Sequence, residues 1–355
     1  MPAGSKPVLA GLVAQELAEL LKAYPAFRAR QIHKWICSGA GSFEDMSNLP
    51  LALRHELAQQ YNLFSSAPLS QIQDKDGTVK LGIALQDSAV IEAVILRDDE
   101  GRNTACLSTQ AGCPAGCVFC KTGSLGFKRN LTSAEIAGQF LHLKKIEPEI
   151  SHIVIMGMGE PLLNLEELRK ALYFFMETGG LNISKRRITL STCGIEKSIL
   201  DFAEHGPDIR LALSLTTARR ELRERLMPIS RAHPLPQIRE ALLEYQLIRQ
   251  RRITLEMVLL GGINTSTADA DAAADFVKGG STGGNGSGKK LKAVINLIPW
   301  NPVQGIAFEG QPLRPPSHPE IAAFTTALEQ HGLNVTRRFR KGAGISGACG
   351  QLGVV

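Results

Sequence analysis

The feature that most constrains this chain is a regular alternation of strand-like and helix-like segments that begins near residue 103. Strands are expected near 104–109, 152–156, 187–191, 209–215, 253–260 and 292–298. Amphipathic helices are expected near 132–146, 164–178, 195–204, 235–249, 267–278 and 318–331. Six strand–helix repeats predict an α/β fold with a parallel sheet, either doubly wound or closed into an incomplete barrel.

The segment before this repeat follows other patterns. Apolar residues recur at helical spacing between about residues 10 and 62, which predicts helices there. A β-rich stretch follows, in which Asp76-Gly77 predicts a hairpin turn. We therefore expect a helical domain over 1–65, a β-rich connector over 66–102 and the repeat over 103–355. The glycine- and serine-rich stretch 279–288 is predicted to be a flexible loop without chemistry.

Charge and hydropathy limit the partners and the compartment. No apolar run approaches the roughly 18 residues of a membrane span, and the N-terminus lacks the apolar core of a secretion signal. We therefore expect a cytoplasmic protein that does not contact membranes. The net charge is +6, and basic residues cluster at 128–129, 185–187, 219–220, 249–252 and 337–341. Such clusters suit a polyanion such as RNA, although each alone could be a solvated face.

Three of the seven cysteines lie within eight residues, as Cys113, Cys117 and Cys120. Thiolates at this spacing can bind one face of a metal centre from a single loop. Structural zinc and cubane iron–sulfur clusters both usually take four protein ligands, yet no fourth Cys or His follows at short distance. Three ligands would leave one iron of a cubane open to a substrate. The alternative is a zinc knuckle with a remote fourth ligand.

Polar segments stand where four of the expected strands end, at 157–161, 191–194, 214–216 and 296–301. In parallel strand–helix barrels, chemistry collects at this end of the strands. Glycines in the first segment allow a ligand to approach the backbone, and Glu160 is suited to accept hydrogen bonds from an ammonium group. We expect these segments and the cysteine loop to form one site.

The cysteine spacing before a six-fold repeat resembles the radical S-adenosylmethionine superfamily. Within it, the chain is similar to the RlmN-type adenine methyltransferases of ribosomal RNA. The similarity rests on the motifs at Phe27–Gln31, Lys34-Trp35, Asp76-Gly77-Thr78, Thr122-Gly123, Arg129-Asn130-Leu131, 157–164 (GMGEPLLN), 184–194 (SKRRITLSTCG), 295–302 (INLIPWNP) and 348–352 (ACGQL). This resemblance implies a partial (β/α)6 TIM-like barrel with an N-terminal helical domain that helps to bind RNA.

The resemblance also implies cofactors and their contacts. Cys113, Cys117 and Cys120 would hold a [4Fe–4S] cluster, whose open iron chelates S-adenosylmethionine, with two such molecules consumed per turnover. The implied contacts of S-adenosylmethionine are Gly159, Glu160, Ser191, Ser214, Leu215, Thr216 and Asn296. Relatives commonly read Ser-Leu-His where this chain has Thr216, whose hydroxyl can still form a hydrogen bond. Cys193 and Cys37 are interpreted as structural.

Two further cysteines and one glutamate receive roles from the same resemblance. Cys349 is expected to carry a methyl group, which after radical activation adds to carbon 2 of adenine 2503 in 23S ribosomal RNA as a covalent protein–RNA adduct. Glu92 is the expected proton acceptor. Cys106 then attacks the sulfur of Cys349, which releases the RNA and leaves a transient disulfide. An external electron donor and a disulfide reductant would serve this ping-pong reaction, and we expect a monomer.

Three alternatives stay open at this point. A related resistance-type methyltransferase would act on carbon 8 of the same adenine. A non-catalytic RNA-binding protein with a structural iron–sulfur cluster would need neither Cys349 nor Cys106. Adenine 37 of transfer RNAs is a possible second target of a carbon 2 enzyme.

Overall fold

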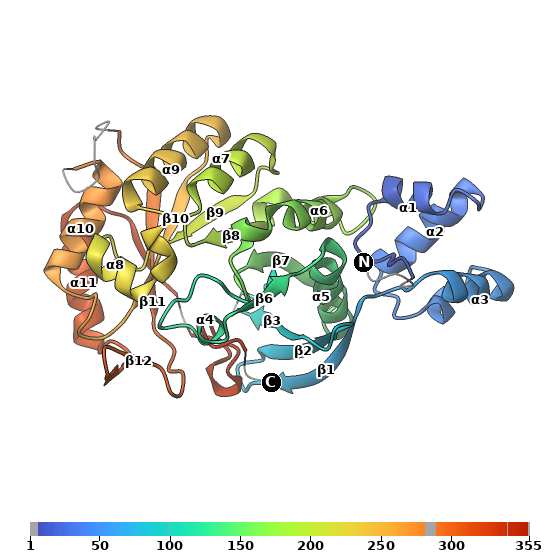
Figure 1. The fold of residues 1–355 in the computed structure, drawn as a ribbon, viewed down its shortest axis with the longest axis horizontal. Coiled ribbons are helices and arrows are strands. Elements are labelled where there is room, and N and C mark those ends of the chain that lie inside the picture. Colours follow the sequence, from blue (N-terminus) through green and yellow to red (C-terminus); the bar gives the residue numbers. More distant parts are fainter. Residues whose placement is uncertain (1–5, 99, 281–288, 339, 354–355) are drawn as a thin grey trace.

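A ten-stranded sheet runs through the computed structural model, in the order β1-β2-β3-β4-β7-β8-β9-β10-β11-β14 (Figure 1). The structure describes residues 6–98, 100–280, 289–338 and 340–353. Most of the predicted glycine-rich loop, residues 281–288, therefore lies outside the described residues. From β4 to β14 every neighbouring pair of strands is parallel, which places the C-terminal strand ends at one edge.

The predicted strand–helix repeat is present in full. Its parallel strands are β4 (Asn103–Cys106), β7 (Ile150–Ile155), β8 (Ile188–Thr192), β9 (Arg210–Ser214), β10 (Ile253–Leu259), β11 (Ala293–Pro299) and β14 (Val335–Arg337). The helices are α5 (Ser133–Ile146), α6 (Leu165–Met176), α7 (Glu196–His205), α8 (Arg220–Leu226), α9 (Leu235–Arg249), α10 (Thr267–Lys278) and α11 (His318–Gln330). The prediction of an α/β fold with a partial barrel is confirmed. β14 was not predicted, because three residues give no periodicity.

Local sequence explains why these elements form. The parallel strands are apolar along most of their length because helices cover their outer face, and Leu190, Leu211 and Leu255 are at most 1% exposed. Three of the helices begin with a capping box, in which a Ser or Thr and an acidic residue three positions later satisfy each other's backbone N–H groups. These boxes are Thr132 with Glu135, Ser266 with Asp269, and Ser317 with Glu320.

The N-terminal part packs on one side of the barrel (Figure 1). Its helices are α1 (Ala14–Leu20), α2 (Ala26–Cys37), the short η1 (Phe43–Asp45) and α3 (Leu51–Gln60). Glu177, after α6, fixes these helices to the barrel: its carboxylate accepts a hydrogen bond from the backbone N–H of Ala14 at 2.8 Å and pairs with His33 at 2.8 Å.

The connector strands extend the barrel sheet. They are β1 (Ser66–Gln73), β2 (Val79–Leu85) and β3 (Val90–Arg97), all antiparallel to their neighbours, and β3 pairs with β4. The predicted turn at Asp76-Gly77 joins β1 to β2, and the N–H of Asp74 donates to the carbonyl of Thr78. The connector and the barrel therefore share a continuous hydrogen-bonded sheet.

Short elements surround the open end of the barrel. They are β5 (Gln110–Gly112), α4 (Lys121–Ser124), β6 (Phe127–Asn130), η2 (Pro161–Asn164), η4 (Pro228–Arg231), β12 (Ala307–Phe308), β13 (Gln311–Pro312) and η6 (Ala343–Ile345), whereas η3 (Lys185–Arg187) directly precedes β8 at the other end. β5 and β6 pair as a hairpin that encloses the cysteine loop. Within the described ranges, no helix combines the length and the apolar character that a membrane crossing requires.

Candidate active site

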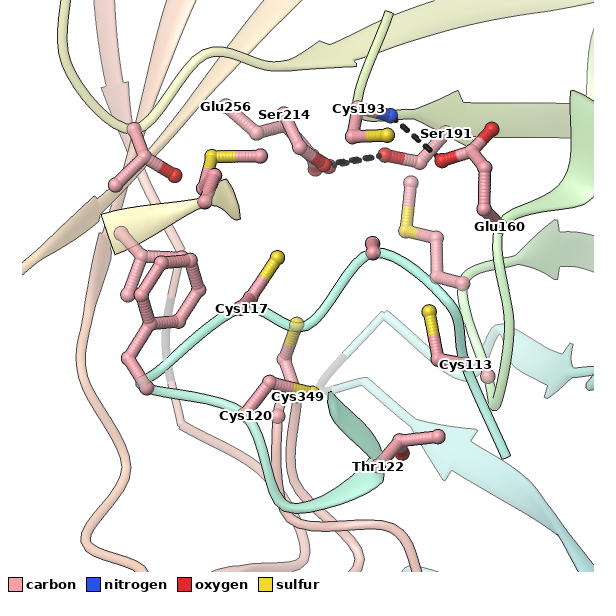
Figure 2. A pocket seen from close by; sticks show the side chains of 18 of the residues that line it. Cys113, Cys117, Cys120, Thr122, Glu160, Ser191, Cys193, Ser214, Glu256 and Cys349 are labelled. Atoms are coloured by element: carbon pink, nitrogen blue, oxygen red, sulfur yellow. Dashed lines mark hydrogen bonds between the residues drawn. The ribbon is translucent and has the colours of Figure 1, made fainter. Parts of the chain in front are cut away.

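A pocket lies at the C-terminal ends of the parallel strands, between the cysteine loop and the ends of β7 to β11 (Figure 2). Nine of the predicted site residues line it, from segments more than 200 positions apart in the sequence. They are Cys113, Cys117, Cys120, Gly159, Glu160, Ser191, Ser214, Thr216 and Cys349. The expectation that the polar strand ends and the cysteine loop meet is therefore confirmed by their common pocket.

The cysteine loop is held mainly by backbone hydrogen bonds. The N–H of Cys113 donates to Gly126 at 2.9 Å, and that of Val118 donates to Leu226 at 3.0 Å. The indole N–H of Trp300, after β11, donates to the carbonyl of Phe119 at 2.8 Å. Because the backbone carries the loop, the three cysteine side chains are available to face the pocket.

The three thiols fit a cluster better than a single ion. Among the described residues, no three His, Cys, Asp or Glu side chains converge closely enough to hold one metal ion. A zinc knuckle needs all its ligands around one ion, whereas a cubane takes one cysteine per iron and keeps the sulfurs apart. Burial raises the pKa of Cys113 to about 12, so its thiolate form requires a bound cation, as metal coordination supplies.

The turn after β7 presents Glu160 at the wall of the pocket. Its carboxylate accepts a hydrogen bond from the N–H of Cys193 at 2.8 Å (Figure 2). It also accepts from the hydroxyl of Thr192 at 2.6 Å. Gly159 has φ +106°, and a Cβ there would lie 2.6 Å from the Cβ of Gln110. Only glycine fits this approach, so the GMGE sequence fixes the position of the glutamate.

Three hydroxyl groups and a second carboxylate lie on the same side of the pocket as Glu160, across from the cysteine loop (Figure 2). The hydroxyls of Ser191 and Ser214 lie 3.2 Å apart, and Ser191 donates to Glu256 at 2.9 Å. Thr216 is fully buried at φ +59°, a backbone region that β-branched residues rarely adopt. Its hydroxyl has no hydrogen-bond partner among the residues that the structure describes. A buried, unsatisfied polar group in a strained position points to a ligand that would satisfy it.

A second cavity adjoins the pocket inside the barrel, with a volume of about 720 Å³. Cys106, at the end of β4, and Cys349 both line it, and Cys349 lines the pocket as well. Burial and the neighbouring Cys349 raise the pKa of Cys106 to about 12. The surrounding protein also raises the pKa of Cys349 to about 11, although the guanidinium of Arg338 acts in the opposite direction. Both cysteines are free thiols.

Besides Cys106, three of the predicted site residues lie away from the pocket wall. Asn296 lines the second cavity, with its side-chain oxygen 3.2 Å from the hydroxyl of Thr336. The side chain of Leu215 is fully buried. Glu92 lies behind the C-terminal tail, where it pairs with Lys80 at 2.8 Å and accepts from the N–H of Gly353 at 2.5 Å. The structure thus brings the tail, but not the pocket, into contact with Glu92.

Several residues of the pocket and of the second cavity were not predicted individually. Glu256 is a charged residue inside the apolar strand β10, and this break in the apolar pattern could have identified it as a site residue. Asn301 donates to the carbonyl of Cys349 at 3.0 Å, and within the described part of the chain its buried side-chain oxygen has no partner. Arg338 lies 4.0 Å from Glu256. Cys193, interpreted as structural, also lines the pocket. Asn301 falls within the predicted polar segment 296–301 and Arg338 within the basic cluster 337–341, but their contacts join segments that are distant in sequence.

Comparisons with known proteins agree with this geometry. Residues 107–273 match the model of the radical SAM superfamily. A crystal structure of a radical SAM methyltransferase from Sphaerobacter thermophilus is similar over 98% of this chain and 99% of that chain, with a TM-score of 0.89 and 35% identity. The fold and the site define a radical S-adenosylmethionine enzyme.

The N-terminal helices and relatives of the whole chain identify the family within this class of enzymes. Residues 9–63 match the ribosomal RNA large subunit methyltransferase N-terminal domain. A probable dual-specificity RNA methyltransferase RlmN from Treponema denticola is 44% identical, over 98% of this chain and 96% of that protein. One from Thermus thermophilus is 40% identical, over 92% of this chain and 88% of that protein. The chain belongs to the RlmN family of radical SAM RNA methyltransferases.

Proposed function

We propose that this protein methylates carbon 2 of adenine 2503 in 23S ribosomal RNA, as a cytoplasmic monomer. The observation that carries the proposal is the position of Cys349, which lines both the cluster pocket and the cavity that holds Cys106. A cysteine at this junction can receive a methyl group on one side and meet a second thiol on the other. Membership of the RlmN family supports RNA as the substrate.

The proposed cofactors have matching donors in the pocket. Cys113, Cys117 and Cys120 would hold a [4Fe–4S] cluster, and S-adenosylmethionine would lie against Gly159, Glu160, Ser191, Ser214, Leu215 and Thr216, with Asn296 reaching it from the second cavity. The unsatisfied hydroxyl of Thr216 suits such a polar ligand. When bound, these groups supply the methyl group and the radical that activates it, with two molecules of S-adenosylmethionine per turnover.

The chain itself would carry the methyl group and release the product. The sulfur of Cys349 would lose its proton and bond to the methyl carbon as the bond from that carbon to the sulfonium of the donor breaks. After loss of a hydrogen atom to the radical, the same carbon would bond to the adenine, and one electron would leave the adduct. Cys106 would then lose its proton and attack the sulfur of Cys349, so that an S–S bond forms, the C–S bond breaks, and the released carbon takes the electron pair and a proton to become the methyl group. A dithiol reductant outside the protein restores both thiols, and a separate external donor supplies electrons to the cluster.

Glu92 is the proposed proton acceptor for the ring hydrogen. It contacts the backbone of Gly353, four residues after Cys349, and Lys80 compensates its charge. A carboxylate held at the end of the tail is placed to act when the tail carries the adduct.

Direct measurement of the product tests this function. The protein would be expressed in cells that lack 2-methyladenosine, and nucleosides from 23S ribosomal RNA and from transfer RNA would be analysed by mass spectrometry. We expect 2-methyladenosine at position 2503. Methylation at carbon 8 would identify the resistance-type activity instead, and unmodified RNA with an intact cluster would indicate a binding protein. A signal at adenine 37 of transfer RNA would add a second substrate.

A further inference from the structure

The second cavity continues the interior of the barrel away from the cluster pocket. Residues two apart on a strand face the same side, so Ser214, Ala212 and Arg210 form one inward row on β9. Ser214 lines the cluster pocket, whereas Ala212 and Arg210 line the cavity. Four residues of strand span about 13 Å. The cavity thus reaches from the two exchanging cysteines to the N-terminal strand ends.

The choice of residues keeps this part of the barrel hollow. Closed strand–helix barrels are filled by layers of bulky branched side chains. Here the inward positions of β4, β8, β9 and β10 are small, as Thr104, Thr189, Ala212 and Thr254. The resulting volume, about 720 Å³, lies in the range of roughly 300–1,000 Å³ typical of ligand sites.

The lining of the cavity is strongly basic. Its acidic residues are Asp98 and Glu256, and its basic residues are Arg97, Arg102, Arg210, Arg252, Arg337, Arg338, Arg340 and Lys341. Arg97 and Arg102 have carboxylate partners. Arg210, Arg252 and Arg337 have none among the residues that the structure describes.

Three of these arginines lie exposed at the wall of the cavity, as Arg210, Arg252 and Arg337. The pKa of His152, on β7, is lowered by its burial and by the charges of Arg187, Arg102 and Arg210. Guanidinium groups are well suited to bind phosphates through two parallel hydrogen bonds. Arginines that have no carboxylate partner among the described residues therefore favour a polyanionic ligand for this cavity.

We propose that this arginine-lined cavity binds the phosphates of the nucleotides next to the target adenosine. The RNA strand then runs along the barrel interior, from Cys349 toward Arg210 and Arg252. This inference rests on the proposed function. It means that the RNA would contact the barrel interior in addition to the N-terminal helices. The phosphate contacts position the target base without reading its sequence.

The test compares two double variants of the full-length, cluster-loaded protein. Arg210→Gln/Arg252→Gln removes two cavity charges. Lys197→Gln/Lys278→Gln removes two charges from exposed positions on α7 and α10. Binding of an unmethylated 23S ribosomal RNA fragment that contains adenine 2503 is measured between 50 and 200 mM salt, a range that changes phosphate binding strongly.

The cavity variant should bind roughly tenfold or more weakly at low salt. Its log–log salt slope should be shallower than that of the wild type by about 1.5, because each phosphate contact contributes about 0.7 to 0.9. The control variant should follow the wild type in both respects. Equal slopes for both variants and the wild type would overturn the assignment.

A second readout does not depend on the variants. A 4-thiouridine next to the target adenosine, irradiated in complex with the wild-type protein, should cross-link to peptides of β8, β9 or β10. Cross-links confined to α1–α3 would contradict the proposal even if the arginine variants failed to fold. If the wild type methylates no adenosine of the fragment, the proposed function is wrong; if it methylates and both cavity tests fail, only the cavity assignment is wrong.

Discussion

The cysteine loop and the C-terminal tail reach the same pocket by different means. The loop carries its three cysteines within eight residues, and backbone hydrogen bonds hold it. The tail brings one cysteine from the far end of the chain, and buried side chains hold it. Thr122 donates to the carbonyl of Leu352 at 2.7 Å, and Glu92 accepts from Gly353. The N–H of Lys121 donates to Gly350 and joins the two segments.

The functions of the loop and of the tail depend on different features of the sequence. The metal-binding capacity of the loop depends on local spacing, so it should survive changes elsewhere in the molecule. The role of Cys349 depends on contacts between residues that are distant in sequence, so loss of a buried anchor should impair it. Each prediction below tests one side of this contrast.

The largest effect should follow removal of the loop thiols. Replacing Cys113, Cys117 and Cys120 together by Ala should lower the iron content from about four per chain to none. Formation of 5′-deoxyadenosine should then be abolished. Iron analysis and the visible absorption of anaerobically purified protein measure this. Cys37→Ala, which removes a buried thiol from α2, is the control and should keep its iron. Full iron in the triple variant would show that the loop is not the metal site.

Removal of the tail thiol should abolish methylation of the RNA without loss of iron. Cys349→Ala has no methyl acceptor, so it should leave RNA unmodified while its iron content stays at the wild-type level. Cys106→Ala should fail later, because its Cys349 can still form the adduct but no thiol resolves it. RNA should therefore stay covalently bound to this variant.

A denaturing gel with and without nuclease distinguishes these two cysteine variants. A nuclease-sensitive shift is expected for Cys106→Ala alone. Normal turnover of Cys106→Ala would remove its resolving role, and methylation by Cys349→Ala would refute the mechanism.

The anchor of the tail gives the next prediction. Glu92→Gln and Lys80→Gln both break a buried ion pair whose side chains are 1% and 5% exposed. Each should lower the free energy of unfolding by roughly 3 kcal/mol, because each removes one charge of a buried pair. Only Glu92→Gln removes the proposed proton acceptor, so it alone should slow turnover, by about 100-fold or more.

Chemical unfolding and single-turnover assays separate the anchoring role of Glu92 from its chemical role. Equal losses of turnover in the two variants would assign Glu92 to the anchoring of the tail only.

The same contrast explains how far the sequence could predict the structure. The strand expected at 253–260 is Ile253–Leu259, and the helix expected at 267–278 has those bounds, because periodicity and a capping box are local signals. The cysteine spacing was equally readable. Three features could not be predicted, since each depends on segments that only the folded sheet brings together. They are the ion pair of Glu92 with Lys80, the contact of Asn301 with Cys349 and the position of Arg338.

The smallest effect concerns the support of the cysteine loop at the surface. Arg129, on β6, pairs with Asp87 at 2.6 Å and with Glu135 at 2.8 Å. The hydrogen bond from Arg129 lowers the pKa of Asp87 from 3.8 to about 2. Because Asp87 is 48% exposed, solvent screens the pair, and Asp87→Asn should lower the free energy of unfolding at pH 7 by less than about 1 kcal/mol.

The pH dependence of this small effect is itself a test of its origin. A carboxyl group whose pKa is lower in the folded state stabilises the protein above its unfolded pKa, and this contribution is lost as the pH falls through the folded value. The difference between wild type and Asp87→Asn should therefore be constant above about pH 5 and decrease progressively as the pH falls through about 2. Urea unfolding in the cluster-free background of the triple cysteine variant measures it, because iron release in acid would otherwise interfere. A difference that is as large at pH 2 as at pH 7 would assign the support of the loop to packing. The loop would then resemble the tail, which buried side chains hold.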